Sequence, residues 1–141
     1  MIQSTVLVTG AGGAALPALI DGLHADGHRV IAVDADPNAV GLYLADRGYR
    51  IPFAAADEFV PALRRICSAE KVGVLIPLVD EELLGIAALG VELQIPMIGP
   101  VAEFTGLCLD KFELMRRMSE AGLPTPLTRL LSEGTAGCRF P

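Results

Sequence analysis

Short apolar runs rich in valine and isoleucine alternate along this 141-residue chain with longer segments whose apolar residues recur at helical spacing. A strand that is covered on both faces of a parallel sheet reads as a continuous apolar run, as Val30 to Val33 does. A crossover helix that packs on the sheet reads as an amphipathic segment, as the stretch from Leu16 to Leu23 does. The alternation therefore predicts an α/β fold, with a doubly wound, mostly parallel five-stranded sheet and helices on both faces.

Glycine, proline and capping residues give the expected bounds of these elements. The five predicted strands are Thr5–Thr9, Arg29–Asp34, Tyr49–Phe53, Val72–Val79 and Ile95–Ile98. The first predicted helix follows the glycine-rich turn and runs to about Ala25. The next three are Ala39–Asp46, ended by Gly48, then Asp57–Glu70 and Asp80–Leu89. A helix of about two turns follows Pro100, and the last begins at Lys111 and stops at Gly122. Pro52 has no N–H and places the third strand at a sheet edge, while Asp110 and Glu113 have capping-box spacing. We expect a Rossmann-like domain over residues 1–122 and a linker over residues 123–141.

The composition is apolar and acidic, with 52% hydrophobic residues and a net charge of −6 from 11 basic and 17 acidic side chains. This balance excludes a disordered chain and argues against nucleic acid as a partner, since nucleic-acid binding needs a basic surface. The longest apolar run, Leu83 to Val91, is far shorter than the roughly 18 residues of a membrane span. Cys67, Cys108 and Cys138 are odd in number and widely spaced, which fits neither disulfides nor a metal site. We expect a cytoplasmic protein without a membrane partner.

A glycine-rich turn follows the first predicted strand and opens a helix. Gly10, Gly12 and Ala15 satisfy the G-x-G-x-x-G/A spacing of dinucleotide-binding turns, and Asp34 ends the second strand where an acid can accept from ribose hydroxyls. The longer glycine pattern of short-chain dehydrogenases stops at Leu16, and neither tyrosine is followed four residues later by lysine. Three interpretations stay open at this point: an NAD(P)-binding module, another ligand site, or a turn that needs glycine for packing alone.

Two charged features lie outside that turn. Asp80, Glu81 and Glu82 follow the fourth predicted strand, at the sheet edge where open α/β folds bind ligands, so that Asp80 or Glu82 could receive a cationic amine. Ordinary capping of the next helix explains the same acids. Lys111 opposes the dipole in the first turn of its helix, which favours a phosphate partner; the alternative is a solvated surface charge.

The order of these segments resembles the N-terminal domain that precedes the catalytic core of ATP-grasp enzymes, most closely the group similar to the carbamoyl-phosphate synthase large subunit and to PylC-like ligases. Four segments carry the resemblance: VLVTGAGG at 6–13, VDADPNAVGLYLADRGYRIP at 33–52, LIPLVDEEL at 75–83 and CLDKFELMRRMSEAGLPTP at 108–126. Together they span nearly the whole chain.

The resemblance implies a function that the residues alone do not give. Enzymes of this kind use ATP and Mg²⁺ to phosphorylate a carboxylate, and an amine then attacks the acyl phosphate. By this resemblance Lys111 contacts ATP phosphate, no residue of this chain is catalytic and none binds metal. The positions that match the substrate wall are Gly10, Gly12, Gly13, Asp34, Asp80 and Glu82.

The family's phosphate-covering loop, second ATP-binding lysine and magnesium ligands lie downstream of the segment at 137–141, where this sequence stops. We therefore expect a fragment that is inactive alone and binds no cofactor tightly, whose partners are the missing ATP-grasp domain and a small carboxylate or amine substrate. Its apolar face predicts a homodimer. The alternatives are an NAD(P)-binding Rossmann module and a stand-alone domain that binds a small ligand.

Overall fold

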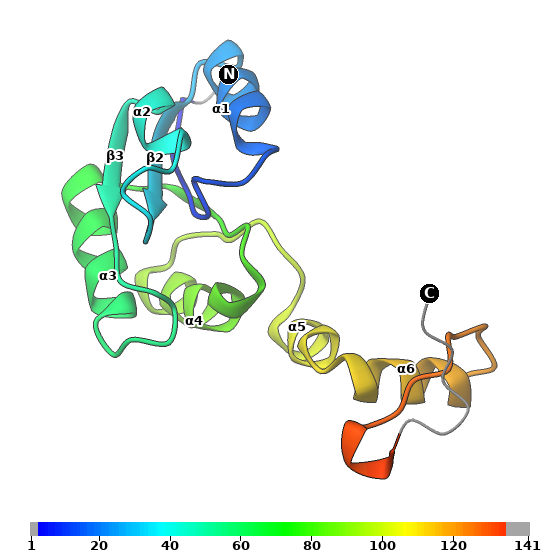
Figure 1. Cartoon of the computed structure of the whole chain (residues 1–141). Coiled ribbons are helices and arrows are strands. Elements are labelled where there is room, and N and C mark those ends of the chain that lie inside the picture. The colour runs from blue at the N-terminus through cyan, green and yellow to red at the C-terminus, as the bar shows by residue number, and fades with distance from the viewer. Residues whose placement is uncertain (1–2, 135–141) are drawn as a thin grey trace. The chain divides into compact units, whose positions relative to one another are not determined.

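The computed structural model describes residues 3–134 and divides the chain into two compact units, Met1–Ala102 and Glu103–Pro141. The first unit is built on a parallel sheet whose strand order is β3-β2-β1-β4 (Figure 1). Its strands are β1 (Thr5–Val8), β2 (Arg29–Asp34), β3 (Arg47–Arg50) and β4 (Val74–Ile76). The predicted α/β class and parallel sheet are confirmed.

The predicted fifth strand, Ile95–Ile98, is reduced to a single parallel bridge between Leu75 and Met97. Two hydrogen bonds hold it, from Leu75 N to the Pro96 carbonyl (2.9 Å) and from Ile98 N to the Leu75 carbonyl (2.8 Å). Pro96 has no N–H to donate, and β4 itself ends before Pro77, so the ladder cannot extend in either direction. Within the described residues the sheet has four strands, and the expectation of five is wrong.

Helices cover both faces of the sheet, as the doubly wound prediction requires (Figure 1). In β1 the side chains of Val6 and Val8 join one buried cluster and that of Leu7 joins the other, because successive residues of a strand point to opposite faces. One cluster packs against α1 (Leu16–Ala25) and α2 (Gly41–Leu44), and the other against α3 (Phe59–Glu70) and α4 (Leu83–Leu93). The core is therefore two layers of apolar side chains with the sheet between them.

Several element bounds differ from the predictions around the third strand and the acidic triplet. The predicted helix Ala39–Asp46 is the single turn α2, and β3 occupies residues 47–50, so Gly48 lies within the strand instead of ending the helix. A Cβ at Gly48 would lie 2.1 Å from the Leu42 carbonyl oxygen, which explains the glycine by close packing of α2 on β3. Asp80–Glu82 form a 3₁₀ turn, η1, and α4 begins only at Leu83.

The second unit contains most of α5 (Ala102–Leu109), all of α6 (Lys111–Glu120) and a 3₁₀ turn, η2 (Leu131–Glu133). The predicted cap is confirmed: Asp110 Oδ1 accepts from the Glu113 N–H at 3.0 Å. The carboxylate of Glu113 does not complete the capping box, since it accepts from Arg116 Nη2 at 2.7 Å and Arg117 Nε at 2.8 Å. These two guanidinium groups, Arg116 first, lower the pKa of Glu113 to about 2.

Two acids tie the helices of the first unit to the sheet near the amino ends of β2 and β3. Glu70, the last residue of α3, accepts from the Tyr49 hydroxyl and the Arg29 guanidinium. Asp46 accepts from the Val30 N–H at 2.8 Å and lies 3.0 Å from His24 Nε2. Hydrogen bonding to Tyr49 and Arg29 lowers the pKa of Glu70, and the backbone bond from Val30 is the main cause of the lowered pKa of Asp46.

These lowered pKa values predict acid sensitivity of the first unit. A carboxyl whose pKa is depressed by folding stabilises the folded state above its unfolded pKa, and that stabilisation is lost as the pH falls through the folded pKa. We expect the free energy of unfolding, measured by urea titration, to fall between about pH 6 and about pH 3. Glu70→Gln should reduce this pH dependence, whereas Asp21→Asn on the exposed side of α1 should not. Equal pH dependence in both variants would contradict the assignment.

Candidate functional site

The glycine turn after β1 is held by bonds within the protein. Gly10 has φ +66°, and a Cβ there would lie 2.8 Å from Val79 Cγ2. The next three N–H groups all have partners: Ala11 donates to the Val33 carbonyl (3.3 Å), Gly12 to Asp34 Oδ2 (2.9 Å) and Gly13 to the Gly10 carbonyl (2.9 Å). The turn therefore folds back on the end of β2, and these three donors do not face a ligand.

Asp34 connects the glycine turn to the loop after β2. Its Oδ2 accepts from Gly12 N, and its Oδ1 accepts from the Asp36 N–H at 2.8 Å. A dinucleotide site uses the turn to donate N–H groups to a pyrophosphate and the acid to accept from a ribose. Here the turn donates to two backbone carbonyls and to Asp34 itself, and both oxygens of Asp34 accept from backbone N–H groups. This arrangement argues against the NAD(P) interpretation.

A cavity of about 450 Å³ lies at the carboxyl edge of the sheet, where the turns after the strands converge. Its lining residues belong entirely to the first unit and are Gly10, Asp34, Ala35, Phe53, Ala54, Ala55, Val79, Glu81 and Glu82. The volume is in the range of small-molecule sites. The carboxyl edge, the cavity and its convergent acids make it the candidate binding site.

Glu82 is the buried acid of this cavity. Only 8% of the residue is exposed, and its Oε2 has no hydrogen-bond partner among the described residues. Burial raises the pKa of Glu82; the Thr9 hydroxyl, as a hydrogen-bond donor, opposes that rise, and the charges of Asp34 and Glu81 add to it. Thr9 is itself buried and accepts from the Leu78 N–H at 3.2 Å. Thr9 is thus a partner of the carboxylate, while Oε2 has no partner among the described residues.

Three of the six predicted substrate-wall residues, Gly10, Asp34 and Glu82, line the cavity. Gly12 and Gly13 are exposed and shape the turn, and Asp80 is exposed at the start of η1. Whether any of the six binds substrate stays a prediction.

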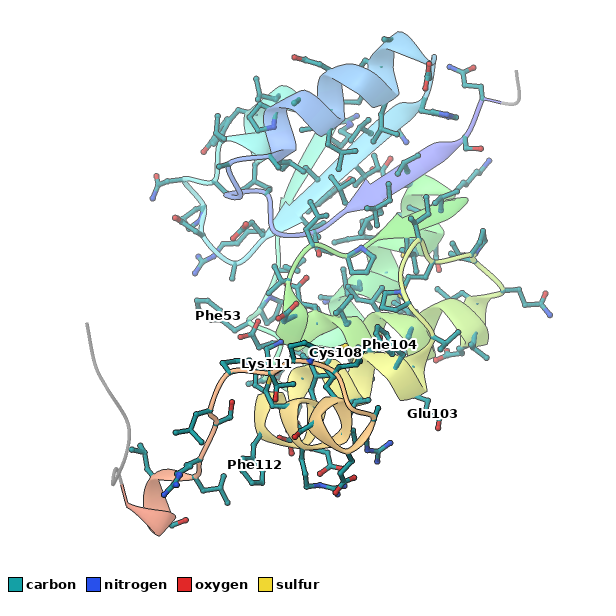
Figure 2. The ribbon with its side chains drawn as sticks, turned by 90° about the vertical axis from the view of Figure 1, so that its right-hand side faces the viewer. Phe53, Glu103, Phe104, Cys108, Lys111 and Phe112 are labelled. Atoms are coloured by element: carbon teal, nitrogen blue, oxygen red, sulfur yellow. The ribbon has the colours of Figure 1, made fainter. Side chains whose placement is uncertain are left out.

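The sequence analysis did not select the other six lining residues as site residues, although it named Glu81 in the acidic triplet. They are Ala35, Phe53, Ala54, Ala55, Val79 and Glu81. The chain places Phe53 on the loop that follows β3, where it is labelled in Figure 2. Ligands bind at the carboxyl ends of strands in such sheets. With the correct end of β3, this rule would have predicted that Phe53 lies at the site.

Lys111 belongs to the second unit, where its side chain bonds to the backbone. Its Nζ lies 2.6 Å from the Cys108 carbonyl oxygen, at the junction of α5 and α6 labelled in Figure 2. A lysine that donates to a carbonyl at the end of a helix satisfies one of the groups that the helix leaves open. This bond explains an unusual helix position without a phosphate, and the phosphate role stays a prediction.

Within residues 3–134 no three or more His, Cys, Asp or Glu side chains are grouped so that they could hold a metal. Cys67 is buried and burial raises the pKa of its thiol to about 11, as for an inert packed cysteine; Cys138 lies outside the described residues. Over the same part of the chain, no helix has both the length and the apolar character to span a membrane.

Comparison with known proteins identifies the family. The model of the PylC-like N-terminal domain matches residues 6–98, about two thirds of the chain. No curated protein matches. The match confirms the resemblance to the PylC-like group and covers both the glycine turn and the acidic triplet.

Solved structures share the fold at low sequence identity. An L-amino acid ligase from Bacillus licheniformis has a TM-score of 0.73 at 16% identity, over 94% of this chain and 34% of that one. Glycinamide-RNase-transformylase T from Mycobacterium tuberculosis has a TM-score of 0.67 at 20% identity, over 86% and 36%. The biotin carboxylase domain dimer of 2-oxoglutarate carboxylase from Hydrogenobacter thermophilus has a TM-score of 0.67 at 22% identity, over 89% and 29%. The chain spans about a third of the length of these structures and shares its fold with that part of them.

The glycines of the turn differ in what they tolerate, which gives a direct test of the turn geometry. Gly10→Ala places a Cβ against Val79 at a positive φ and should lower the free energy of unfolding by about 1–3 kcal/mol. Gly12→Ala places its Cβ 3.7 Å from Asp34 Oδ2 and Ala39 Cβ, an ordinary contact, and should change stability by less than about 1 kcal/mol. Denaturant unfolding of both variants measures the difference. Equal losses would mean that the turn has another conformation.

Proposed function

Because the chain belongs to the PylC-like N-terminal domain family, we propose that it is the substrate-side domain of an ATP-dependent carboxylate–amine ligase. The observation that carries the proposal is the cavity at the carboxyl edge of the sheet, into which Gly10, Asp34 and Glu82 converge. The similarity in fold to an L-amino acid ligase supports the same class. The whole enzyme would be cytoplasmic and carbamoyl-phosphate synthase-like in mechanism.

In such a reaction ATP transfers its terminal phosphoryl group to a carboxylate, and an amine then attacks the acyl carbon and releases phosphate. Bound ATP and Mg²⁺ supply the phosphoryl group and neutralise its charge in the complete enzyme. The residues of this chain have a different task. Asp34 holds the glycine turn in place, and the rigid turn, Val79 and Glu82 form one wall that orients a substrate. Lys111, from the second unit, is the proposed phosphate contact.

A second candidate is a stand-alone domain that binds a small ligand without catalysis. It is favoured by one observation: every residue that lines the cavity lies in the first unit, so the pocket does not depend on another domain for its walls. The gene beyond the codon for Pro141 separates the two candidates. A downstream strand ending in lysine and a Gly/Ser-rich loop support the ligase. An isolated reading frame supports the binding domain.

The ligase proposal makes a prediction about nucleotide hydrolysis. The 141-residue chain should release no phosphate from ATP above background, whereas the product of a longer reading frame should release ADP only when carboxylate and amine are both present. In that longer product, Lys111→Met should raise the KM for ATP by about tenfold, a typical loss for a charge-assisted phosphate contact. Lys71→Met, at the end of α3, is the matched control. Phosphate release by the 141-residue chain that disappears on Lys111→Met would contradict the proposal.

We also propose that the chain forms a homodimer through an apolar groove of about 730 Å³ formed by α4 and the segment after it. Three large apolar side chains that line this groove are exposed, Val91 at 82%, Val101 at 73% and Leu84 at 45%, which is unusual for apolar side chains grouped on one surface. A structure of similar fold is described as a dimer. Sedimentation equilibrium should give twice the monomer mass, and Val91→Asp should give monomer, whereas Leu44→Asp on α2 should not. A wild-type monomer at high concentration would contradict this.

A further inference from the structure

The unpartnered oxygen of Glu82 is the strongest chemical signal in the first unit. Glu82 is more than nine-tenths buried, lines the cavity, and has an Oε2 with no hydrogen-bond partner in the described structure. A buried carboxylate oxygen without a donor is unfavourable, because it has lost its water and gained nothing in exchange. Such a group indicates that a donor from outside the chain belongs beside it.

The charges that line the cavity indicate what kind of donor the ligand carries. Three of its nine lining residues are acids, Asp34, Glu81 and Glu82, and none is basic. Arg50 reaches the rim but not the lining, and its Nε donates to the carbonyl of the lining residue Ala35 at 3.3 Å. The potential inside the cavity therefore favours a cation, and the N–H groups of the glycine turn, already engaged, offer nothing to an anion.

The remaining lining gives the size and character of the ligand. Phe53 is 76% exposed, and with Val79, Ala54 and Ala55 it presents an apolar surface around the acids. An alkyl stem can pack on this surface, and a cation gains further attraction from the face of an aromatic ring. The volume of about 450 Å³ admits a small metabolite but no polymer.

We propose that the cavity binds the primary ammonium group of a small aliphatic amine, and that the carboxylate of Glu82 accepts a hydrogen bond from that ammonium. The Thr9 hydroxyl, which accepts from the Leu78 N–H, bonds to the carboxylate, and the ammonium supplies the donor that Oε2 lacks. An ammonium held in this way has no free electron pair, so it serves for recognition and is not the attacking nitrogen. The proposal deepens the proposed function and rests on it only for naming the ligand a substrate.

The test uses the 141-residue chain and three probes of one size: n-butylamine, n-butanol and butanoate. At neutral pH the first is a cation, the second neutral and the third an anion. In a titration followed by ¹⁵N NMR, butylammonium should shift the amide signals of Gly10, Val79 and Glu82. Butanol should bind at least about tenfold more weakly, as expected for the loss of one charge-assisted bond, and butanoate should not bind.

The matched variants are Glu82→Gln and Asp57→Asn. Glu82→Gln keeps the shape but removes the charge and should weaken butylammonium binding at least about tenfold. Asp57→Asn removes an exposed acid of the first unit that does not line the cavity and should change binding by less than about twofold. Thermal unfolding shows whether each variant is folded. If Glu82→Gln does not fold, Glu82→Asp, which keeps the charge but shortens the side chain, replaces it with the same expectation.

Equal affinity for butylammonium and butanol, or binding unchanged by the Glu82 variants, would overturn the proposal. So would equal losses in the Glu82 and Asp57 variants, since that would indicate only a diffuse charge effect. The outcome is separate from that of the ligase proposal. Amine binding that depends on Glu82, in a protein whose full reading frame does not hydrolyse ATP, would refute the ligase and leave the ammonium site intact.

Discussion

The carboxylate of Asp34 is the constraint on which the carboxyl edge of the sheet depends. By accepting from Gly12 N with one oxygen and from Asp36 N with the other, it joins the glycine turn to the loop after β2. The two loops are thus fixed relative to each other although they lie 22 residues apart. Gly10, in the same turn, packs closely against Val79. This contact also fixes the segment that follows β4. The cavity walls follow from these two fixed points.

The acids that stabilise the fold lie at one edge of the sheet, and the acids that line the cavity lie at the other. Near the amino ends of β2 and β3, Glu70 and Asp46 have hydrogen-bond partners, and those bonds lower their pKa values. At the carboxyl edge, Glu82 has a raised pKa and an oxygen without a partner. Acids of the first kind stabilise the fold when ionised, whereas an acid of the second kind opposes it. Such a distribution is typical of a scaffold that holds a binding site at one end.

Sequence reasoning succeeded where a local signal decides the structure. The continuous apolar run of β2 gave its bounds, and Asp110 gave the start of α6, because periodicity and capping act within a few residues. Sequence reasoning failed where contacts between residues far apart in the chain decide the structure. The fifth strand is reduced to one bridge because Pro96 lacks an N–H and its partner β4 is short. β3 begins earlier than the residue pattern predicts, because Gly48 packs closely against the backbone of Leu42. The missed cavity residue Phe53 follows from that last error.

The burial of Glu82 is not explained by the capping chemistry that accounts for its neighbours. Acids before a helix are favoured because they face its dipole, and Asp80 and Glu81 do this while exposed to water. Glu82 occupies the N-cap of α4 without a capping bond from its side chain and is turned inward, against Thr9 and the charges of Asp34 and Glu81. A glutamine would accept from Thr9 as well and would avoid the charge repulsion. The carboxylate is therefore unfavourable for the fold alone and becomes favourable only when a cation shares the cavity.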